Sequence, residues 1–305
     1  MKLLSASNMN TVLRSLTMLL ALPTALAAQN FDSVQVKAQL LRNGVYMLTG
    51  SGGNIGLSVG PDGAFIIDDQ FAPLTGKILA AIKAITPLPV KFVVNTHWHF
   101  DHTGGNENMG KAGAMLVAQD NVRKRMSAGQ FLEFLKRTEK AAPAIALPVI
   151  TFSESITFHI NGDELQAFHV PPAHTDGDAI VRFAHANVIH MGDTYVRYGF
   201  PFVDLSSGGN VGGLVHAADR ALSFCNVDTK VIPGHGDVAD CAMLKSYRDM
   251  IATIRDRVSA AMRAGKSLDA IKALKPTAEF DAKVGGTFVS PNQFVEFTYR
   301  SLGGK

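Results

Sequence analysis

Short apolar and β-branched runs separated by glycine-rich turns open the chain after Gln29 and predict a β-meander. Residues 60–63, Gly-Pro-Asp-Gly, are typical of a hairpin turn between two of these strands. A stretch with helical periodicity follows at 74–85, and then a short apolar strand at 90–95. The strands expected in the meander are residues 34–41, 44–48, 55–59 and 64–67.

The second half of the chain repeats the alternation of strands and helices. Apolar residues recur every three to four positions between Met243 and Val258, which indicates a helix that packs one face on the core. Ser290 followed by Pro291 is typical of a helix start, so a last helix is expected to run to about Ser301. The other expected elements are a helix that Asp120 caps and that runs toward Lys140, strands at 155–160, 165–170, 179–184, 188–191 and 229–232, and a helix at 211–223.

These two α/β halves predict one globular domain, because no long linker or low-complexity segment separates them. Each sheet has an apolar face to bury, and the economical arrangement is two mixed sheets packed face to face with helices outside. The sequence therefore predicts an α/β sandwich whose single domain spans residues 28–305.

The first 27 residues differ from the rest and are typical of a secretory signal peptide. Lys2 and Arg14 precede an apolar run at 16–22, and Ala25-Leu26-Ala27 offers small residues at a cleavage point. The alternative, a membrane anchor, needs roughly 20 apolar residues, whereas this run is shorter and ends at Pro23. We therefore expect residues 1–27 to be removed on export, which leaves a periplasmic or secreted protein without a stable membrane anchor.

The balance of charge along the chain indicates which classes of binding partner to expect. Two of the 29 basic residues lie in the signal segment, so the mature chain is nearly balanced against its 26 acidic residues. Without a dense Lys/Arg block, nucleic acid and anionic lipid are not expected as partners.

Cys225 and Cys241 are the only cysteines, and they could pair in an oxidising compartment or remain two buried thiols; the sequence leaves both open.

Four potential metal ligands lie close together, directly after the apolar strand at 90–95. Side chains alternate along an extended chain, so His97 and His99 point to one side and can bind the same cation. Asp101 and His102 come where the glycines that follow let the chain turn, and they can face a second, neighbouring metal. A lone histidine on a strand is most simply a packed or surface residue, but four ligands together predict a metal centre.

The pattern His-x-His-x-Asp-His resembles the signature of the metallo-β-lactamase superfamily, whose fold is a four-layer αββα sandwich. This resemblance implies three further ligands, each on a loop after a strand. His174, Asp193 and His235 each follow a predicted strand in this way. The implied set is His97, His99 and His174 at the first metal, Asp101, His102 and His235 at the second, and Asp193 bridging both. The other histidines have no counterpart in the family and are expected to be structural.

The resemblance implies a hydrolase with two Zn²⁺ per chain. Nitrogen and carboxylate ligands suit zinc, and positions left open for water are typical of a catalytic site. Iron and manganese use similar ligands in some family members. Zinc can lower the pKa of a bound water to about 7, giving a hydroxide that attacks a carbonyl. Asp101, next to the bridging position, is expected to orient this hydroxide and to move its proton.

The substrate is a small molecule whose class stays open. Hydrolysis of an amide or lactam, as in β-lactamases, suits an exported enzyme, whereas a bridging Asp193 is more similar to glyoxalase II-like thioesterases and to lactonases. A catalytically inert periplasmic metal-binding protein is a further alternative. Three residues are expected to contact the substrate. Asn210 could present its amide or cap a helix, Tyr195 could stabilise an oxyanion or pack, and Arg197 is the nearest cation to Asp193.

Overall fold

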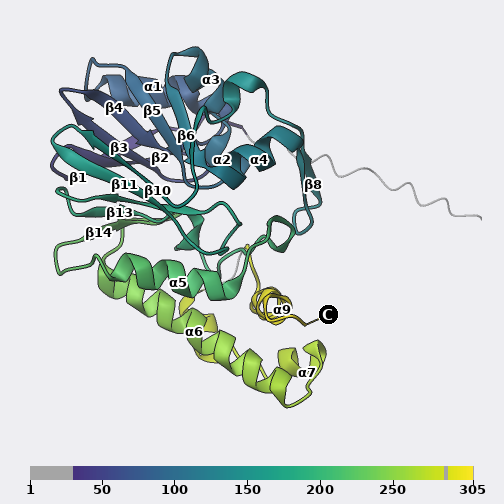
Figure 1. Cartoon of the computed structure of the whole chain (residues 1–305). Coiled ribbons are helices and arrows are strands. Elements are labelled where there is room, and N and C mark those ends of the chain that lie inside the picture. Colours follow the sequence, from purple (N-terminus) through teal and green to yellow (C-terminus); the bar gives the residue numbers. More distant parts are fainter. Residues whose placement is uncertain (1–29, 285–287, 305) are drawn as a thin grey trace, which may run out of the picture. The chain divides into compact units, whose positions relative to one another are not determined.

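The computed structural model describes residues 30–284 and 288–304, and the chain from Phe31 onward forms one compact unit. The predicted signal segment lies outside the described residues. Figure 1 shows the two sheets packed against each other with helices on the outside, so the predicted α/β sandwich is confirmed. Within the described ranges, no helix is both long and apolar enough to cross a membrane.

The first sheet has seven strands in the order β1-β2-β3-β4-β5-β6-β9. Its first four strands form the predicted antiparallel meander, and the other three add to it in parallel. The strands are β1 Lys37–Arg42, β2 Val45–Thr49, β3 Ile55–Gly60, β4 Gly63–Ile67, β5 Val90–Asn95, β6 Met115–Gln119 and β9 Ile150–Phe152. The predicted strand positions hold to within a few residues.

The second sheet has five strands in the order β10-β11-β12-β13-β14. All pair antiparallel except β13 with β14, which are parallel because helix α5 crosses over between them. The strands are β10 Ser155–Ile160, β11 Asp163–His169, β12 Ala179–Phe183, β13 Val188–His190 and β14 Lys230–Ile232. This sheet too lies where the sequence predicts it.

Helices cover the outer face of each sheet. The helices are α1 Thr75–Lys83, α2 Phe100–Thr103, α3 Asn106–Lys111, α4 Asp120–Ala128, α5 Val211–Leu222, α6 Cys241–Arg263, α7 Leu268–Ala273, α8 Ala278–Val284 and α9 Pro291–Ser301. Three apolar layers result. Ile67 and Phe183 pack between the sheets, Ile66 packs against α1, and Ile189 packs against α5 and α6. Neighbours such as Ile66 and Ile67 face opposite layers because side chains alternate along a strand.

The helix predicted to run from Asp120 toward Lys140 is shorter than expected. It ends at Ala128, and Gly129 follows with a positive φ of 71°, which residues with a side chain rarely adopt and which stops the helix. Its cap is the side chain of Gln119, which accepts from the amide of Asn121, so capping by Asp120 is also wrong. A hairpin of β7 (Gln130–Leu132) and β8 (Arg137–Glu139) takes the place of the expected helical turns.

The two cysteines form a disulfide, which decides between the alternatives that the sequence leaves open. Cys225 follows helix α5 and Cys241 is the first residue of α6, with their Cα atoms 6.0 Å apart. The bond thus ties together the two helices that cover the second sheet.

Candidate metal centre

The predicted ligands come from loops at the ends of strands in both sheets. The histidine pair lies on the loop after β5, and Asp101 and His102 lie in the short helix α2 that follows. His174 follows β11, Asp193 lies in a 3-10 turn directly after β13, and His235 follows β14. The sandwich therefore brings side chains from both sheets into one cluster.

His97, His99 and His174 form the first group, and their ligand nitrogens lie within 4.8 Å of one another. The Nδ1 of His99 is 2.8 Å from the Nε2 of His174. The Nε2 of His97 is buried and has no hydrogen-bond partner among the described residues. A buried polar atom without a partner costs about 1–3 kcal/mol, so this nitrogen lacks a partner that a cation would supply.

Asp101, His102 and His235 form the second group. The two Nε2 atoms lie 3.3 Å apart, and Asp101 Oδ2 lies 3.3 Å from the Nε2 of His235. Asp193 reaches both groups, because its Oδ1 is 3.1 Å from His102 Nε2 and its Oδ2 is 3.7 Å from His174 Nε2. Its carboxylate thus lies between the two groups.

The donor set fits divalent cations. Like the Nε2 of His97, the Oδ1 of Asp193 is buried and makes no well-aligned hydrogen bond among the residues described, although His102 Nε2 lies 3.1 Å away as an ion-pair partner. Two imidazole nitrogens that face each other can share at most one proton, whereas a cation between them binds both lone pairs. The site therefore contains one cluster of three histidines and one His/Asp cluster that could each hold a metal ion, with the Asp193 carboxylate between them. Asp68, His97 and His102 form a third, overlapping group of suitable ligand atoms.

Three of the ligand histidines contact an acceptor through the ring nitrogen that points away from the cluster. Asp204 Oδ2 lies 3.0 Å from the Nε2 of His99, and Asp68 Oδ2 lies 2.7 Å from the Nδ1 of His102. The Nδ1 of His174 bonds a backbone carbonyl at 2.8 Å. Because each contact occupies one ring nitrogen, it determines which nitrogen faces the cluster.

Sequence reasoning missed both supporting carboxylates. Asp68 directly follows the apolar strand β4, which pairs with β5, so a polar residue at that strand end was a usable signal. It also accepts from the backbone amide and the hydroxyl of Thr96, at 2.7 and 2.8 Å. Asp204 lies 105 positions from its partner His99, and no local pattern marks it.

Two glycines allow the backbone to approach the ligands closely. A Cβ at Gly53 would lie 2.1 Å from the ring of His102, and a Cβ at Gly234 would lie 2.0 Å from Asp193 Oδ1. Any side chain there would displace a ligand. The glycines of these two loops therefore shape the site directly.

Burial and mutual charge divide the ligands into neutral and charged ones. Burial, together with the neighbouring imidazoles, holds the pKa of His97 well below its ordinary value, so this ring is neutral. Burial alone would lower the pKa of His235, but Asp193 and Asp101 outweigh it and raise the pKa to about 9. Burial would raise the pKa of Asp101, and the two histidines of its group lower it to about 2. Without a metal, the second group therefore balances its carboxylates with imidazolium.

A cavity of about 480 Å³ opens over the cluster. Asp101, Asp193, His99 and His235 contribute to its lining, so it gives access to both groups. The rest of the lining is mostly aromatic. It consists of Phe100, Leu135, Arg137, Tyr198, Phe202 and Phe288.

The structure does not bring the three predicted substrate-contacting residues to this cavity. Asn210 caps α5, and its side chain accepts from the amide of Gly212 at 2.7 Å. Tyr195 is buried, and its ring centroid lies 4.8 Å from that of Tyr247. Arg197 donates to two backbone carbonyls at 2.9 and 3.0 Å. The alternatives of helix capping for Asn210 and packing for Tyr195 agree with these contacts.

His190 is buried close to the ligands, and its two ring nitrogens contact backbone groups, which agrees with the structural role expected for it. Its Nε2 lies 3.0 Å from the carbonyl of Asn54, and its Nδ1 accepts from the amide of Gly192 at 3.1 Å. It therefore joins the loop before Asp193 to the first sheet. The remaining histidines, His159, His169, His185 and His216, are exposed or half-buried.

The fold and this site define an α/β sandwich with a His/Asp metal-binding centre at the ends of its strands. A family model described as the metallo-beta-lactamase superfamily matches residues 48–258, and the chain belongs to this superfamily. Its members are generally hydrolases, and the centre described here is compatible with a metal-dependent one.

Solved structures of the same fold resemble the chain at low sequence identity. A metallo-beta-lactamase from Pontibacter korlensis is 21% identical with a TM-score of 0.58, and the match covers 72% of this chain and 99% of that one. The DIM-1 metallo-beta-lactamase is 19% identical with a TM-score of 0.57 and the same shares, 72% and 99%. The stereoselective inverting sec-alkylsulfatase Pisa1 from Pseudomonas sp. is 17% identical with a TM-score of 0.65, over 87% of this chain and 50% of that one.

Replacing the carboxylate behind His99 should weaken metal binding without unfolding the protein. Asp204→Asn removes the charge that orients the ring, and loss of such a supporting contact typically costs about 10–100-fold in metal affinity. Competition with a chromogenic chelator measures this. Asp219→Asn, on the exposed face of α5 where Asp219 pairs with Arg248, is the matched control and should keep full affinity. Equal affinity in both variants would contradict the supporting role.

Metal affinity at the second group should rise with pH. His235, with its pKa raised to about 9 in the metal-free protein, is protonated near neutral pH and must lose that proton to bind a cation. Despite burial, which alone would lower it, Asp193, Asp101 and Asp68 also raise the pKa of His102 well above its ordinary value, so this second ligand carries a competing proton too. Raising the pH removes these protons, so affinity should increase by at least about tenfold per pH unit and level off above the pKa values of both imidazoles. Calorimetry of zinc binding in buffers of different ionisation enthalpy should detect proton release near neutrality; binding without release would refute this.

Proposed function

We propose that this protein is an exported hydrolase that uses two zinc ions to cleave a small carbonyl substrate. The observation that carries the proposal is the position of Asp193 between two buried ligand groups, beside a His97 nitrogen that lacks a partner among the described residues. His97, His99 and His174 would hold one ion, and Asp101, His102 and His235 the other. When bound, the ions would supply a water with a pKa near 7 and polarise the substrate carbonyl.

The chain's own residues divide the remaining tasks. Asp193 is 7% exposed and lies between the groups, which suits a carboxylate that holds metals. Asp101 is more accessible, lines the cavity and lies 3.3 Å from His235, which suits a group that orients a water and moves its proton. The aromatic lining offers an apolar surface beside the ligands, on which the apolar part of a substrate could lie.

We propose a lactam or related amide as the first substrate class to test. Two observations support an exported enzyme: the signal-like first 27 residues and the disulfide between Cys225 and Cys241, because disulfides persist in oxidising compartments. The position of Asp193 between the two ligand groups supports the thioester or lactone alternative, because it is similar to the bridging aspartate of glyoxalase II-like enzymes. A protein without turnover is the remaining alternative, and the open cavity over the ligands argues against it.

A substrate panel separates these alternatives. The zinc-loaded protein should hydrolyse at least one member of a set containing a chromogenic lactam, a thioester and a lactone, because a preorganised metal site acts on each kind of carbonyl. Chelation should abolish turnover, and adding zinc back should restore it. Metal content near two equivalents should accompany activity. No zinc-dependent turnover of any member, despite full metal content, would favour the inert metal-binding protein.

The two carboxylates should respond differently to neutralisation. Asp193→Asn removes charge between both groups, so zinc content and rate should fall together. Asp101→Asn keeps one oxygen ligand beside His102 and His235, so zinc content should largely persist while the rate falls roughly 100-fold or more, the usual scale of acid-base catalysis. Metal analysis and turnover under saturating zinc measure both. An Asp101→Asn protein with a normal rate, or one that has lost its second zinc, would refute the proton-handling role.

A further inference from the structure

One cation lines the cavity over the metal ligands. Of the residues in its lining, Arg137 is the only lysine or arginine, and it comes from β8 in the hairpin that replaces the predicted helix. The other lining residues that are not ligands are apolar or aromatic, so Arg137 is the one positive side chain of the lining that an anionic substrate group would meet away from the metal ligands.

The Arg137 guanidinium is held in place while part of it stays available. It stacks on the ring of Phe100, 3.6 Å from the ring centroid, and Phe100 is the neighbour of the ligand Asp101. Glu139 pairs with the Nε edge. Among the described residues, the Nη1 and Nη2 atoms have no hydrogen-bond partner, and these two nitrogens form a fork that matches the two oxygens of a carboxylate.

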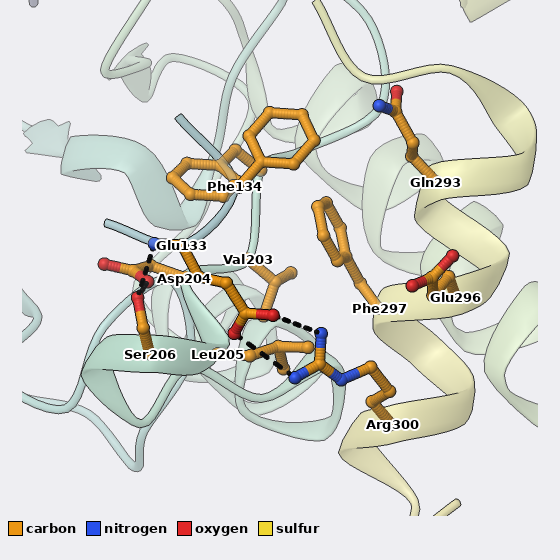
Figure 2. A pocket seen from close by; sticks show the side chains of 11 residues that line it. Glu133, Phe134, Val203, Asp204, Leu205, Ser206, Gln293, Glu296, Phe297 and Arg300 are labelled. Carbon is orange, nitrogen blue, oxygen red and sulfur yellow. Dashed lines mark hydrogen bonds and ion pairs between the residues drawn. The ribbon is translucent and has the colours of Figure 1, made fainter. Parts of the chain in front are cut away.

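The turn of the hairpin is fixed by contacts with the far end of the chain, as Figure 2 shows. The ring of Phe134 lies 5.0 Å from that of Phe202 and 5.3 Å from that of Phe297 on α9. Glu133 pairs with Arg300 of α9 through both oxygens, each at 3.4 Å. These contacts anchor the segment that leads into β8, so the guanidinium is presented to the cavity from a supported position.

We propose that Arg137 binds a carboxylate on the substrate whose apolar body lies along the aromatic wall of the cavity. The proposal rests on the hydrolase function proposed above and adds its substrate class, an apolar or aromatic carboxylate. It also transfers the anion-binding role from Arg197, which the sequence favours, to a residue from a different segment. Arg197 engages backbone carbonyls outside the cavity lining.

Binding of a matched ligand pair tests the proposal apart from catalysis. Phenylacetate and phenylacetamide have the same shape and differ in charge, and their affinities for the zinc-loaded protein can be measured by NMR titration. The wild type should bind phenylacetate more tightly. Arg137→Gln should lose about tenfold to a hundredfold for phenylacetate, the scale of a charge-assisted hydrogen bond, and should change little for phenylacetamide. Arg197→Gln is the matched control and should bind both ligands as the wild type does.

Two outcomes would overturn the proposal. If Arg137→Gln binds phenylacetate as tightly as the wild type, the carboxylate is held by the metals and Arg137 is only a surface partner of Glu139. If Arg197→Gln alone loses affinity, the anion site lies where the sequence favours it. Because the readout is binding, a positive result in a protein that hydrolyses no member of the panel would sustain the carboxylate site while the hydrolase function fails. Zinc content and unfolding midpoint of each variant show that the fold and the metal centre are intact.

Discussion

The cost of burying unpaired ligand nitrogens and carboxylates is the constraint on which this structure depends. Buried polar groups must find partners, because each one left alone costs free energy that a folded protein of ordinary stability cannot easily offset. At the strand ends, His97 and Asp193 each keep one buried atom without a hydrogen-bond partner among the described residues. Asp68 and Asp204 occupy the outer ring nitrogens of other ligands, which directs the remaining nitrogens inward. Folding thus brings together ligand atoms whose missing partner a bound cation would supply.

The local part of this centre could be predicted from sequence, because strand geometry alone places it. His97 and His99 alternate along an extended segment, and Asp101 and His102 follow where the chain turns into α2. The strands themselves were predicted from apolar runs between turn residues. The predicted helix from Asp120 toward Lys140 was wrong because Gly129 stops the helix and the residues beyond it pair as a hairpin. The glycine was visible in the sequence, but the pairing of the hairpin strands was not.

The substrate side of the site could not be predicted, because it depends on contacts between distant segments. Arg197 lies close to Asp193 in sequence, yet the neighbouring Val196 pairs with His235 in a β-bridge, and the arginine then reaches carbonyls outside the cavity. Arg137 gains its position through Phe134, whose partners lie on the loop before α5 and on α9. No spacing rule connects such segments, so proximity in sequence was a poor guide to proximity in the cleft.

The two halves of the site are therefore supported in different ways. The metal ligands depend on strand ends of both sheets and on carboxylates that are fully buried, so a change there disturbs the fold. The cavity wall depends on a hairpin with three-residue strands and on helix α9, which lies beyond the segment that the family model matches. The Glu133–Arg300 pair is partly exposed and contributes little energy, so the packing of Phe134 is what positions this wall. Such a wall can change its shape and charge while the metal ligands stay in place, which is how one fold can keep a common centre and accept different substrates.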